Sequence, residues 1–360
     1  MMQPLTGLKV VDFSTLLPGP LASLMLAEAG AEVVKVERPG FGDESRLMSS
    51  AVFAMLNRGK RSLCIDLKDE RRRAELLDVI ARADILIEQF RPGVMARSGL
   101  GWDAVREINP RLIYCSITGY GQSGPKAARA GHDLNYLAEA GVLSQSRSMP
   151  PVLIADIVGG AYPAVINILL ALAARDRDGE GRHIDVAMTD NLYPLMFWDL
   201  AQGLVAGSWP SAGQGFFTGG LPRYRLYETA DNRMLAVGAV EDRFWAEFCA
   251  VIDLPPSLRD DRRDPAATAE GVAKLVRRHP SDHWRAIFAD KDACCSVVED
   301  LEAALNAPHA QSRDLFGYQV QLEGGEVIPA LPVAVAPAFR SERRVAAAPR
   351  LGEANGYGNV

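Results

Sequence analysis

The chain has 360 residues, 48% of them hydrophobic and 23% charged, and a formal net charge of -6 at pH 7. This length allows about two domains of ordinary size, and the composition is that of a soluble globular protein. The negative net charge argues against a nucleic-acid-binding protein, whose domains are usually basic. Five cysteines without Cys-x-x-Cys spacing, and an N-terminus without a signal-peptide pattern, favour reduced thiols and a cytoplasmic location.

The first 120 residues alternate between short apolar segments and helical segments. This alternation predicts an α/β fold, with a Rossmann-like parallel sheet covered by helices on both faces. The dinucleotide-binding pattern Gly-x-Gly-x-x-Gly is missing after the first strand, which argues against an NAD-dependent enzyme. The predicted strands cover residues 7–14, 32–38, 62–67, 84–90 and 112–118, and the predicted helices cover residues 21–29, 70–82 and 102–108.

Residues 157–174 are apolar apart from Asn167 and are about as long as the shortest membrane-spanning helix. We interpret them as a buried core helix, because they contain Gly159, Gly160 and Pro163 and no second span accompanies them. We therefore expect no membrane partner. A strand over residues 183–188 and a helix over residues 191–204 complete this part of the chain.

Beyond residue 220 the pattern changes and predicts a smaller α+β domain over about 221–300. It contains a hairpin (223–229 and 234–240) and three helices, over 243–252, 267–278 and, after a Ser281 cap, 282–288. The large domain is expected to cover residues 1–190 and to be completed by residues 325–360. Residues 191–220 and 301–324 are then linkers, and the loop-rich tail is expected to pack on the large domain.

The most informative motif is residues 131–136, where His132 stands beside Asp133 after a glycine. Alone, such a pair is often only solvated or capping, but a second carboxylate, Asp156, precedes the apolar helix. An imidazole and a carboxylate, each placed where a loop meets a helix, suit acid/base chemistry on opposite faces of one carbon. Asp156 could instead be a simple N-cap. In the functional interpretation, Gly159 and Gly160 leave the first turn bare, so that backbone N–H groups can receive a substrate carbonyl.

Basic residues cluster near the ends of the predicted strands of the large domain. Such positions bind ligands in α/β folds, so the cluster indicates a phosphorylated ligand, although a solvated basic face is the alternative. No His, Cys and Asp set has the spacing of a metal site, and the other four histidines are interpreted as structural. The cluster consists of Arg38, Arg58, Lys60, Arg61, Lys68 and Arg91.

Several motifs together resemble one family, the class III (CaiB/BaiF) coenzyme A transferases with the α-methylacyl-CoA racemases that share their fold. The resemblance covers nearly the whole chain. At position 132 the transferases usually have an aromatic residue. The chain has His132 there, and in this it resembles the racemase branch. The motifs are GLKVVD (7–12) with PGP (18–20), GAEVVKVERP (30–39), NRGKRSL (57–63), FRPGV (90–94), NPRLIY (109–114) and TGYGQSGP (118–125).

The resemblance implies that His132 and Asp156 are the two bases that remove and return the α-proton of an acyl-CoA, without a cofactor beyond the substrate's own coenzyme A. Asp133 and Glu241 would hold or tune the site. The family fold implies an interlocked homodimer in which the partner subunit supplies Glu241. Positions matching coenzyme A contacts, together with the rest of the 131–136 motif, are Arg38, Ile65, Asp66, Leu67, Lys68, Arg91, Gly131, Leu134, Asn135 and Tyr136.

Two other functions are considered beside the racemase. One is a coenzyme A transferase in which the Asp156 carboxylate attacks the thioester, giving first an anhydride and then an aspartyl thioester. The other is a non-catalytic acyl-CoA-binding protein that keeps the fold without the chemistry. The acyl chain of the substrate is left open by the sequence.

Overall fold

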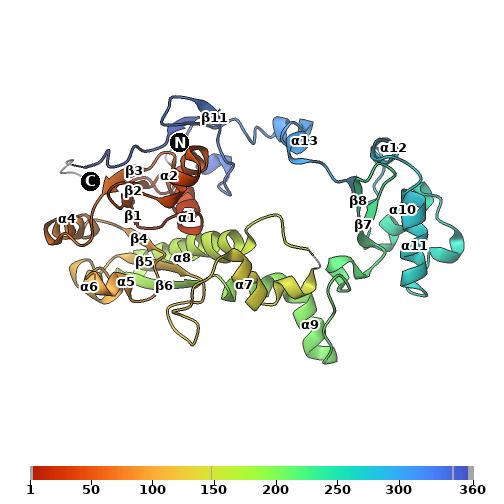
Figure 1. Cartoon of the computed structure of the whole chain (residues 1–360), viewed down its shortest axis with the longest axis horizontal. Helices are drawn as coiled ribbons and strands as arrows, with labels where there is room; N and C mark the ends of the chain where they lie inside the picture. The colour runs from red at the N-terminus through yellow and green to blue at the C-terminus, as the bar shows by residue number, and fades with distance from the viewer. Residues whose placement is uncertain (1–2, 147, 343, 356–360) are drawn as a thin grey trace. The chain divides into compact units, whose positions relative to one another are not determined.

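The computed structural model describes residues 3–146, 148–342 and 344–355 and divides the chain into two compact units (Figure 1). The first unit takes its described residues from Met1–Ala140, Pro150–Leu195 and Ala310–Val360. The second unit takes them from Gly141–Met149 and Met196–His309. Residues 196–220, expected as part of a linker, therefore belong to the second unit.

The first unit is built on one sheet of six parallel strands, which confirms the predicted parallel sheet. The strand order is β3-β2-β1-β4-β5-β6, so the direction of winding reverses between β1 and β4. Ligands of such sheets bind outside the carboxyl ends of the strands at this reversal. The strands are β1 (Lys9–Asp12), β2 (Glu32–Glu37), β3 (Arg61–Cys64), β4 (Ile85–Glu88), β5 (Ile113–Thr118) and β6 (Arg182–Ala187).

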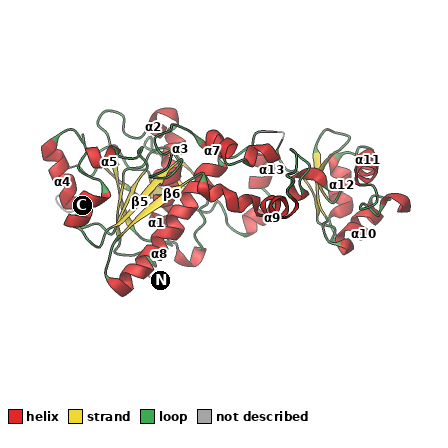
Figure 2. Ribbon diagram, turned by 90° about the horizontal axis from the view of Figure 1, so that it is seen from below, coloured by secondary structure: helices red, strands yellow, loops and turns green. Residues whose placement is uncertain are grey.

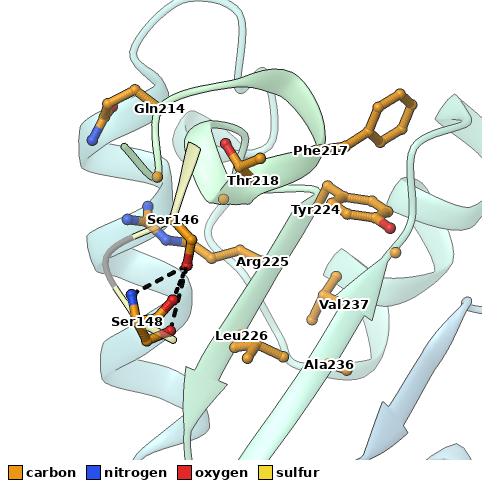
Figure 3. Close-up of a pocket in the computed structure, with 13 residues that line it drawn as sticks. Ser146, Ser148, Gln214, Phe217, Thr218, Tyr224, Arg225, Leu226, Ala236 and Val237 are labelled. Carbon is orange, nitrogen blue, oxygen red and sulfur yellow. Dashed lines mark hydrogen bonds between the residues drawn. The ribbon is translucent and has the colours of Figure 1, made fainter. Parts of the chain in front are cut away.

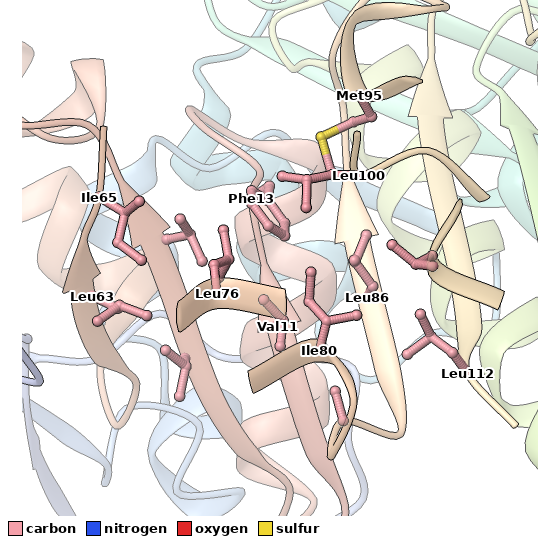
Figure 4. Close-up of a cluster of buried hydrophobic side chains, with 14 of the residues drawn as sticks. Val11, Phe13, Leu63, Ile65, Leu76, Ile80, Leu86, Met95, Leu100 and Leu112 are labelled. Carbon is pink, nitrogen blue, oxygen red and sulfur yellow. The ribbon is translucent and has the colours of Figure 1, made fainter. Parts of the chain in front are cut away.

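Helices cover both faces of this sheet (Figure 2). On one face, Leu76 and Ile80 of α4 pack into an apolar core with Val11 and Leu86 of the strands (Figure 4). Each such fully buried side chain contributes about 1.5–3 kcal/mol. This face carries α4 (Glu70–Ile80), α5 (Val94–Arg97) and α6 (Trp102–Ile108), and the other carries α1 (Pro18–Glu28) and α8 (Tyr162–Asp178).

The face beneath α1 also buries charged groups. Lys60 Nζ lies 3.4 Å from Asp12 Oδ2 and donates hydrogen bonds to Pro20 O at 2.9 Å and Asn57 Oδ1 at 2.8 Å. Arg58 is equally enclosed and pairs with Glu28 at 2.7 Å. The prediction that Arg58 and Lys60 face a phosphorylated ligand is therefore wrong, because both are bound within the protein.

The long apolar segment forms a π-helix, Ala155–Ala161, that runs directly into α8. One face of α8 is buried through Ala164 and Ile168, whereas Ile166 and Leu170 on another face are exposed. The segment Ala155–Asp178 is long and apolar enough to span a membrane by length and composition. In the first unit its inner face packs on β5, β6 and α1, as the core-helix interpretation requires.

The C-terminal tail packs on the first unit, as predicted. It contains a small sheet of order β11-β10-β12 that the sequence did not predict, because each strand is only three residues long. Val320 and Ala330 pack against Ala54, and Arg340 pairs with Glu28 at 2.7 Å. The additional elements of this unit are α2 (Glu44–Met48), α3 (Ser50–Asn57), α7 (Asp133–Glu139), α14 (Pro308–Ser312, which spans the unit boundary), β10 (Gln319–Gln321), β11 (Val327–Pro329) and β12 (Val345–Ala347).

The second unit contains the predicted hairpin, to which a third antiparallel strand is added. Its core is aromatic, with Trp245 stacked on Phe248 and Phe248 on Phe288. Ser281 is the first residue of its helix and not the cap, and its hydroxyl donates to Asp231 at 2.7 Å. The elements are α9 (Phe197–Ala206), β7 (Tyr224–Glu228), β8 (Met234–Gly238), α10 (Asp242–Val251), α11 (Pro265–Val276), α12 (Ser281–Phe288), β9 (Cys295–Val297) and α13 (Leu301–Leu305).

The buried pair of Lys60 and Asp12 gives a stability prediction. Lys60→Met should lower the free energy of unfolding by about 3–5 kcal/mol, because Asp12 would keep a buried charge without this partner. Arg71→Met removes an exposed ion pair with Glu75 on α4, and it should change the free energy of unfolding by less than about 0.5 kcal/mol. Urea denaturation of both variants checks this, and equal effects would contradict it.

Candidate functional site

A cleft of about 430 Å³ lies in the first unit at the carboxyl ends of β1, β4 and β5. This is the place that the reversal of strand order marks for a ligand. The loops after these strands and the starts of α7 and of the π-helix form its walls. The lining includes Leu16, Gln89, Arg91, Thr118, His132 and Asp156.

His132 is the N-cap residue of α7, with an extended backbone (φ -126°, ψ 175°). Its N–H donates to Asn135 Oδ1 at 3.0 Å, and its carbonyl accepts the Asn135 N–H at 2.8 Å. Asn135 therefore fixes the backbone of His132 in both directions. The imidazole is exposed at the cleft wall, where a substrate can reach it.

Asp133 connects His132 to the second predicted base. Its side chain is buried, and Oδ1 accepts the backbone N–H of Asp156 at 3.0 Å. This hydrogen bond joins the first residue of α7 to the π-helix that carries Asp156. The structure thus brings His132, Asp133 and Asp156 together in one place, although 23 residues separate the two aspartates in sequence.

Asp156 is partly buried in the first turn of the π-helix. Burial and, after it, the nearby Asp133 carboxylate raise the pKa of its carboxyl to about 6, while His132 opposes the shift. A carboxyl with a pKa near neutral can both accept and release a proton at physiological pH. Asp156 is therefore suited to acid/base chemistry in this cleft.

The bare helix turn expected at Gly159 and Gly160 is not present. Both glycines are buried, and a Cβ on Gly159 would lie 2.5 Å from the Met188 carbonyl oxygen. The Ile157 N–H already donates to Leu153 O at 3.2 Å. The prediction that this turn is open to a substrate carbonyl is wrong, because the glycines serve close packing against the chain after β6.

Tyr136 holds the loop before α7 in place through a hydrogen bond and close packing. Its hydroxyl donates to the Gly131 carbonyl at 2.5 Å, and a Cβ on Gly119 would lie 2.3 Å from its ring. Burial raises the pKa of this phenol to about 12. Gly131, Asn135 and Tyr136 line the cleft, whereas Leu134 is exposed and does not line it.

The other expected coenzyme A contacts are distributed over the carboxyl edge of the sheet. Arg91 is exposed and lines the cleft, and Arg38 pairs with the nearby Glu44. Ile65 is buried in the core, so its side chain faces the protein interior (Figure 4). Asp66 and Lys68 are exposed after β3, and Leu67 is half-buried between them.

Glu241 belongs to the second unit, where it is the N-cap residue of α10. The same unit has a cavity of about 610 Å³ (Figure 3). Its wall includes Phe217 and Tyr224, whose rings meet edge to face at 5.1 Å, and the side chains of Leu226 and Val237. Among the described residues its lining contains no His, Asp or Glu, in contrast to the first cleft with its His132 and Asp156.

Sequence reasoning missed several residues of the cleft wall, among them Thr118 and Gln89. Thr118 ends β5, and its buried Oγ1 has no hydrogen-bond partner among the described residues. Gln89 follows β4 directly. Their positions at the ends of neighbouring central strands were the signal that could have identified them. In the described part of the chain, no three or more His, Cys, Asp and Glu side chains group as metal ligands.

The chain is similar to known proteins over nearly its whole length. The family model described as CoA-transferase family III matches residues 5–355. The chain is 37% identical over 335 residues to the mouse alpha-methylacyl-CoA racemase, covering 90% of this chain and 84% of that protein. It is 30% identical over 371 residues to the acetyl-CoA:oxalate CoA-transferase of Acetobacter aceti, covering 97% and 93%. The crystal structure of a CaiB/BaiF family protein from Brucella suis matches with a TM-score of 0.83 and 27% identity, covering 98% of this chain and 97% of that one.

The raised pKa of Asp156 predicts a pH-dependent stability. The folded chain binds the carboxyl proton more tightly than the unfolded chain does, because the pKa of Asp156 is higher in the folded state. The folded chain therefore loses stability as the pH rises through about 6 and the carboxyl ionises. Asp156→Asn should therefore raise the free energy of unfolding by about 1–2 kcal/mol at pH 8, with the gain disappearing toward pH 4. Urea denaturation at both pH values measures this. An equal gain at both would mean that packing, and not ionisation, is responsible.

Proposed function

Because the chain belongs to CoA-transferase family III, we propose that it acts on acyl-CoA thioesters as a racemase that inverts the α-carbon of 2-methylacyl-CoA. The observation that carries this proposal is that His132 and Asp156 line the same cleft, joined through the hydrogen bond of Asp133. Two bases of different type in one cleft are what a two-base proton transfer requires. The similarity to a protein named as a racemase supports the same reaction.

The reaction moves one proton on each side of the substrate. One base takes the α-proton, and the electron pair of the broken C–H bond passes into an enolate with its negative charge on the thioester oxygen. The protonated form of the other base then donates a proton to the opposite face of the carbon. His132 and Asp156 end each turnover in exchanged protonation states, so no redox cofactor or metal enters the balance.

Asp133 supports this chemistry through Asp156. Its carboxylate holds the Asp156 backbone and contributes to the raised pKa of the Asp156 carboxyl. In the proposal the coenzyme A moiety contacts Arg91 at the cleft rim, together with Arg38 and the exposed residues Asp66 and Lys68 after β3. Glu241 would be supplied by the second subunit of an interlocked homodimer in the cytoplasm.

A coenzyme A transferase is the second candidate, favoured by the similarity to the Acetobacter aceti transferase over nearly the whole chain. The Asp156 carboxylate would then attack the thioester and expel coenzyme A as a thiolate, leaving an acyl-aspartyl anhydride. The thiolate would return to the aspartyl carbonyl of the anhydride, giving an aspartyl thioester and releasing the first acid as its carboxylate. The acceptor carboxylate would then attack this thioester, forming a second anhydride and freeing the thiolate, which attacks the acceptor's acyl carbon to give the new acyl-CoA and restore the Asp156 carboxylate. His132 would have no required role in these steps.

Deuterium exchange distinguishes the racemase from an enzyme without proton chemistry. Incubation of one epimer of a 2-methylacyl-CoA in deuterated water should give both epimers, with deuterium at C2. His132→Ala and Asp156→Asn should each lower the rate of inversion by about 10²- to 10⁴-fold, because each removes one base. Asp78→Asn, at an exposed position of α4 that does not line the cleft, is the matched control.

The pH profile of the same assay identifies the role of Asp156. In the direction in which Asp156 is the base, kcat/KM should fall as the pH drops through about 6, because its carboxylate becomes protonated. Wild-type protein that gives no second epimer and no deuterium at C2 would refute the racemase proposal.

A trapping experiment separates the transferase. Protein turning over a 2-methylacyl-CoA with an acceptor carboxylic acid is treated with hydroxylamine or borohydride, and the peptide containing Asp156 is weighed by mass spectrometry. We expect an unmodified peptide, since a racemase forms no covalent intermediate. A hydroxamate or a reduced side chain at Asp156 would identify the transferase reaction instead.

A further inference from the structure

The loop between β1 and α1 has an unfavourable backbone at the cleft wall. Leu16 and Pro18 line the cleft, and Leu16 has a φ of +61°. In this left-handed region the Cβ of a non-glycine residue crowds the backbone, which costs about 1–2 kcal/mol. Contacts from the surrounding structure must hold the loop in this form.

The N-terminus of α1 supplies no cap of its own. Its N-cap residue is Leu17, which makes no side-chain hydrogen bond, and neither Pro18 nor Pro20 has an N–H. Gly19 therefore has the one backbone N–H among the first three helical positions. That N–H donates to Gln89 Oε1 at 3.1 Å, so a side chain from the end of β4 caps α1.

The same amide also holds the other end of the loop. Gln89 Nε2 donates to the Thr15 carbonyl at 2.8 Å, so Gln89 bridges Thr15 and Gly19 across the left-handed Leu16. The fit is close: a Cβ on Gly19 would lie 2.1 Å from Ser14 Cβ and 2.8 Å from Gln89 Oε1. Both ends of the turn thus depend on one side chain.

Buried charged groups hold the same loop from a second side. Asp43 Oδ1 accepts the Leu16 N–H at 3.2 Å, and Lys35 Nζ donates to the Ser14 carbonyl at 2.6 Å. Lys35 and Asp43 also pair with each other at 2.9 Å. Of the groups that hold the loop, Gln89 is the one that lines the cleft with His132 and Asp156.

We propose that Gln89 is a positioning residue for the reaction, which sets the Thr15–Gly19 wall of the cleft relative to the two bases. The choice of reaction rests on the proposed function, whereas the bridge itself rests on the two hydrogen bonds of Gln89. A loop placed by two directional bonds holds the thioester near its reactive geometry, and small misplacements of reacting groups cost rates of up to about 10²-fold.

Two substitutions separate positioning from simple helix capping. Gln89→Met removes both hydrogen bonds, whereas Gln89→Glu keeps an acceptor for the Gly19 N–H and places a negative charge at the N-terminus of α1. A carboxylate cannot donate to the Thr15 carbonyl, so Gln89→Glu should recover Tm but not activity. Both variants should lower kcat for C2 deuterium exchange by about 10- to 100-fold, with KM within about threefold.

The matched control is Asn109, a buried amide of the same unit that does not line the cleft. Its Nδ2 donates to Ile80 O at 3.0 Å and Ala83 O at 2.7 Å. Asn109→Leu should lower Tm but leave kcat within about twofold. Full kcat in Gln89→Glu, or the same kcat in Gln89→Met and Asn109→Leu, would overturn the positioning role.

A measurement without substrate tests the bridge independently of the reaction. Amide hydrogen exchange followed by mass spectrometry should be faster in the 15–21 segment of Gln89→Met than in wild type, and unchanged there in Asn109→Leu. Unchanged exchange in Gln89→Met would overturn the bridge whatever the reaction is. Wild-type protein without C2 exchange would overturn the proposed function alone.

Discussion

The parallel arrangement of one sheet constrains everything else in the first unit. Because all six strands point the same way, their carboxyl ends meet at one edge, and the reversal between β1 and β4 leaves a gap there that helices do not fill. The loops that leave β1, β4 and β5 all open into this gap. Residues as distant in sequence as Leu16, Gln89 and His132 therefore line one cleft.

Within that cleft, the position of Asp156 that suits acid/base chemistry is also one that disfavours its ionised form. Placing a carboxyl near the buried Asp133 is unfavourable, and the backbone hydrogen bond between them holds the arrangement. Asp156 lies in a π-helix, an irregularity that is frequent at functional sites. Close packing of Gly159 on the Met188 carbonyl keeps that irregular turn against the sheet.

The cleft wall illustrates the same principle on the side of β1. Three features of this loop are each unfavourable alone. Leu16 has a left-handed backbone, α1 begins with two prolines that lack an N–H, and Gly19 has no space for a Cβ. Together they are accommodated because Gln89, Lys35 and Asp43 satisfy the backbone groups of one short loop. The proposed two-base reaction, which forms no covalent bond between substrate and protein, depends on such a rigid wall beside His132 and Asp156.

The sequence by itself determined the strands of the main parallel sheet, the helices α1, α4, α6 and α8, and the family. These follow from apolar periodicity and short motifs, which are local properties of the chain. It also identified His132, Asp133 and Asp156 as candidates, since each stands where a loop meets a helix. The three-residue strands of the tail escaped prediction because so short a segment carries too little periodicity.

Only the tertiary structure decided which of these groups share a site and which are bound elsewhere. It enclosed Arg58 and Lys60 in ion pairs with Glu28 and Asp12, and it used Gly159 for packing where an open turn was expected. It also assigned Gln89 to the cleft wall. Burial and pairing depend on residues far apart in the chain, so the one-dimensional pattern could propose cations, glycines and amides but not their partners.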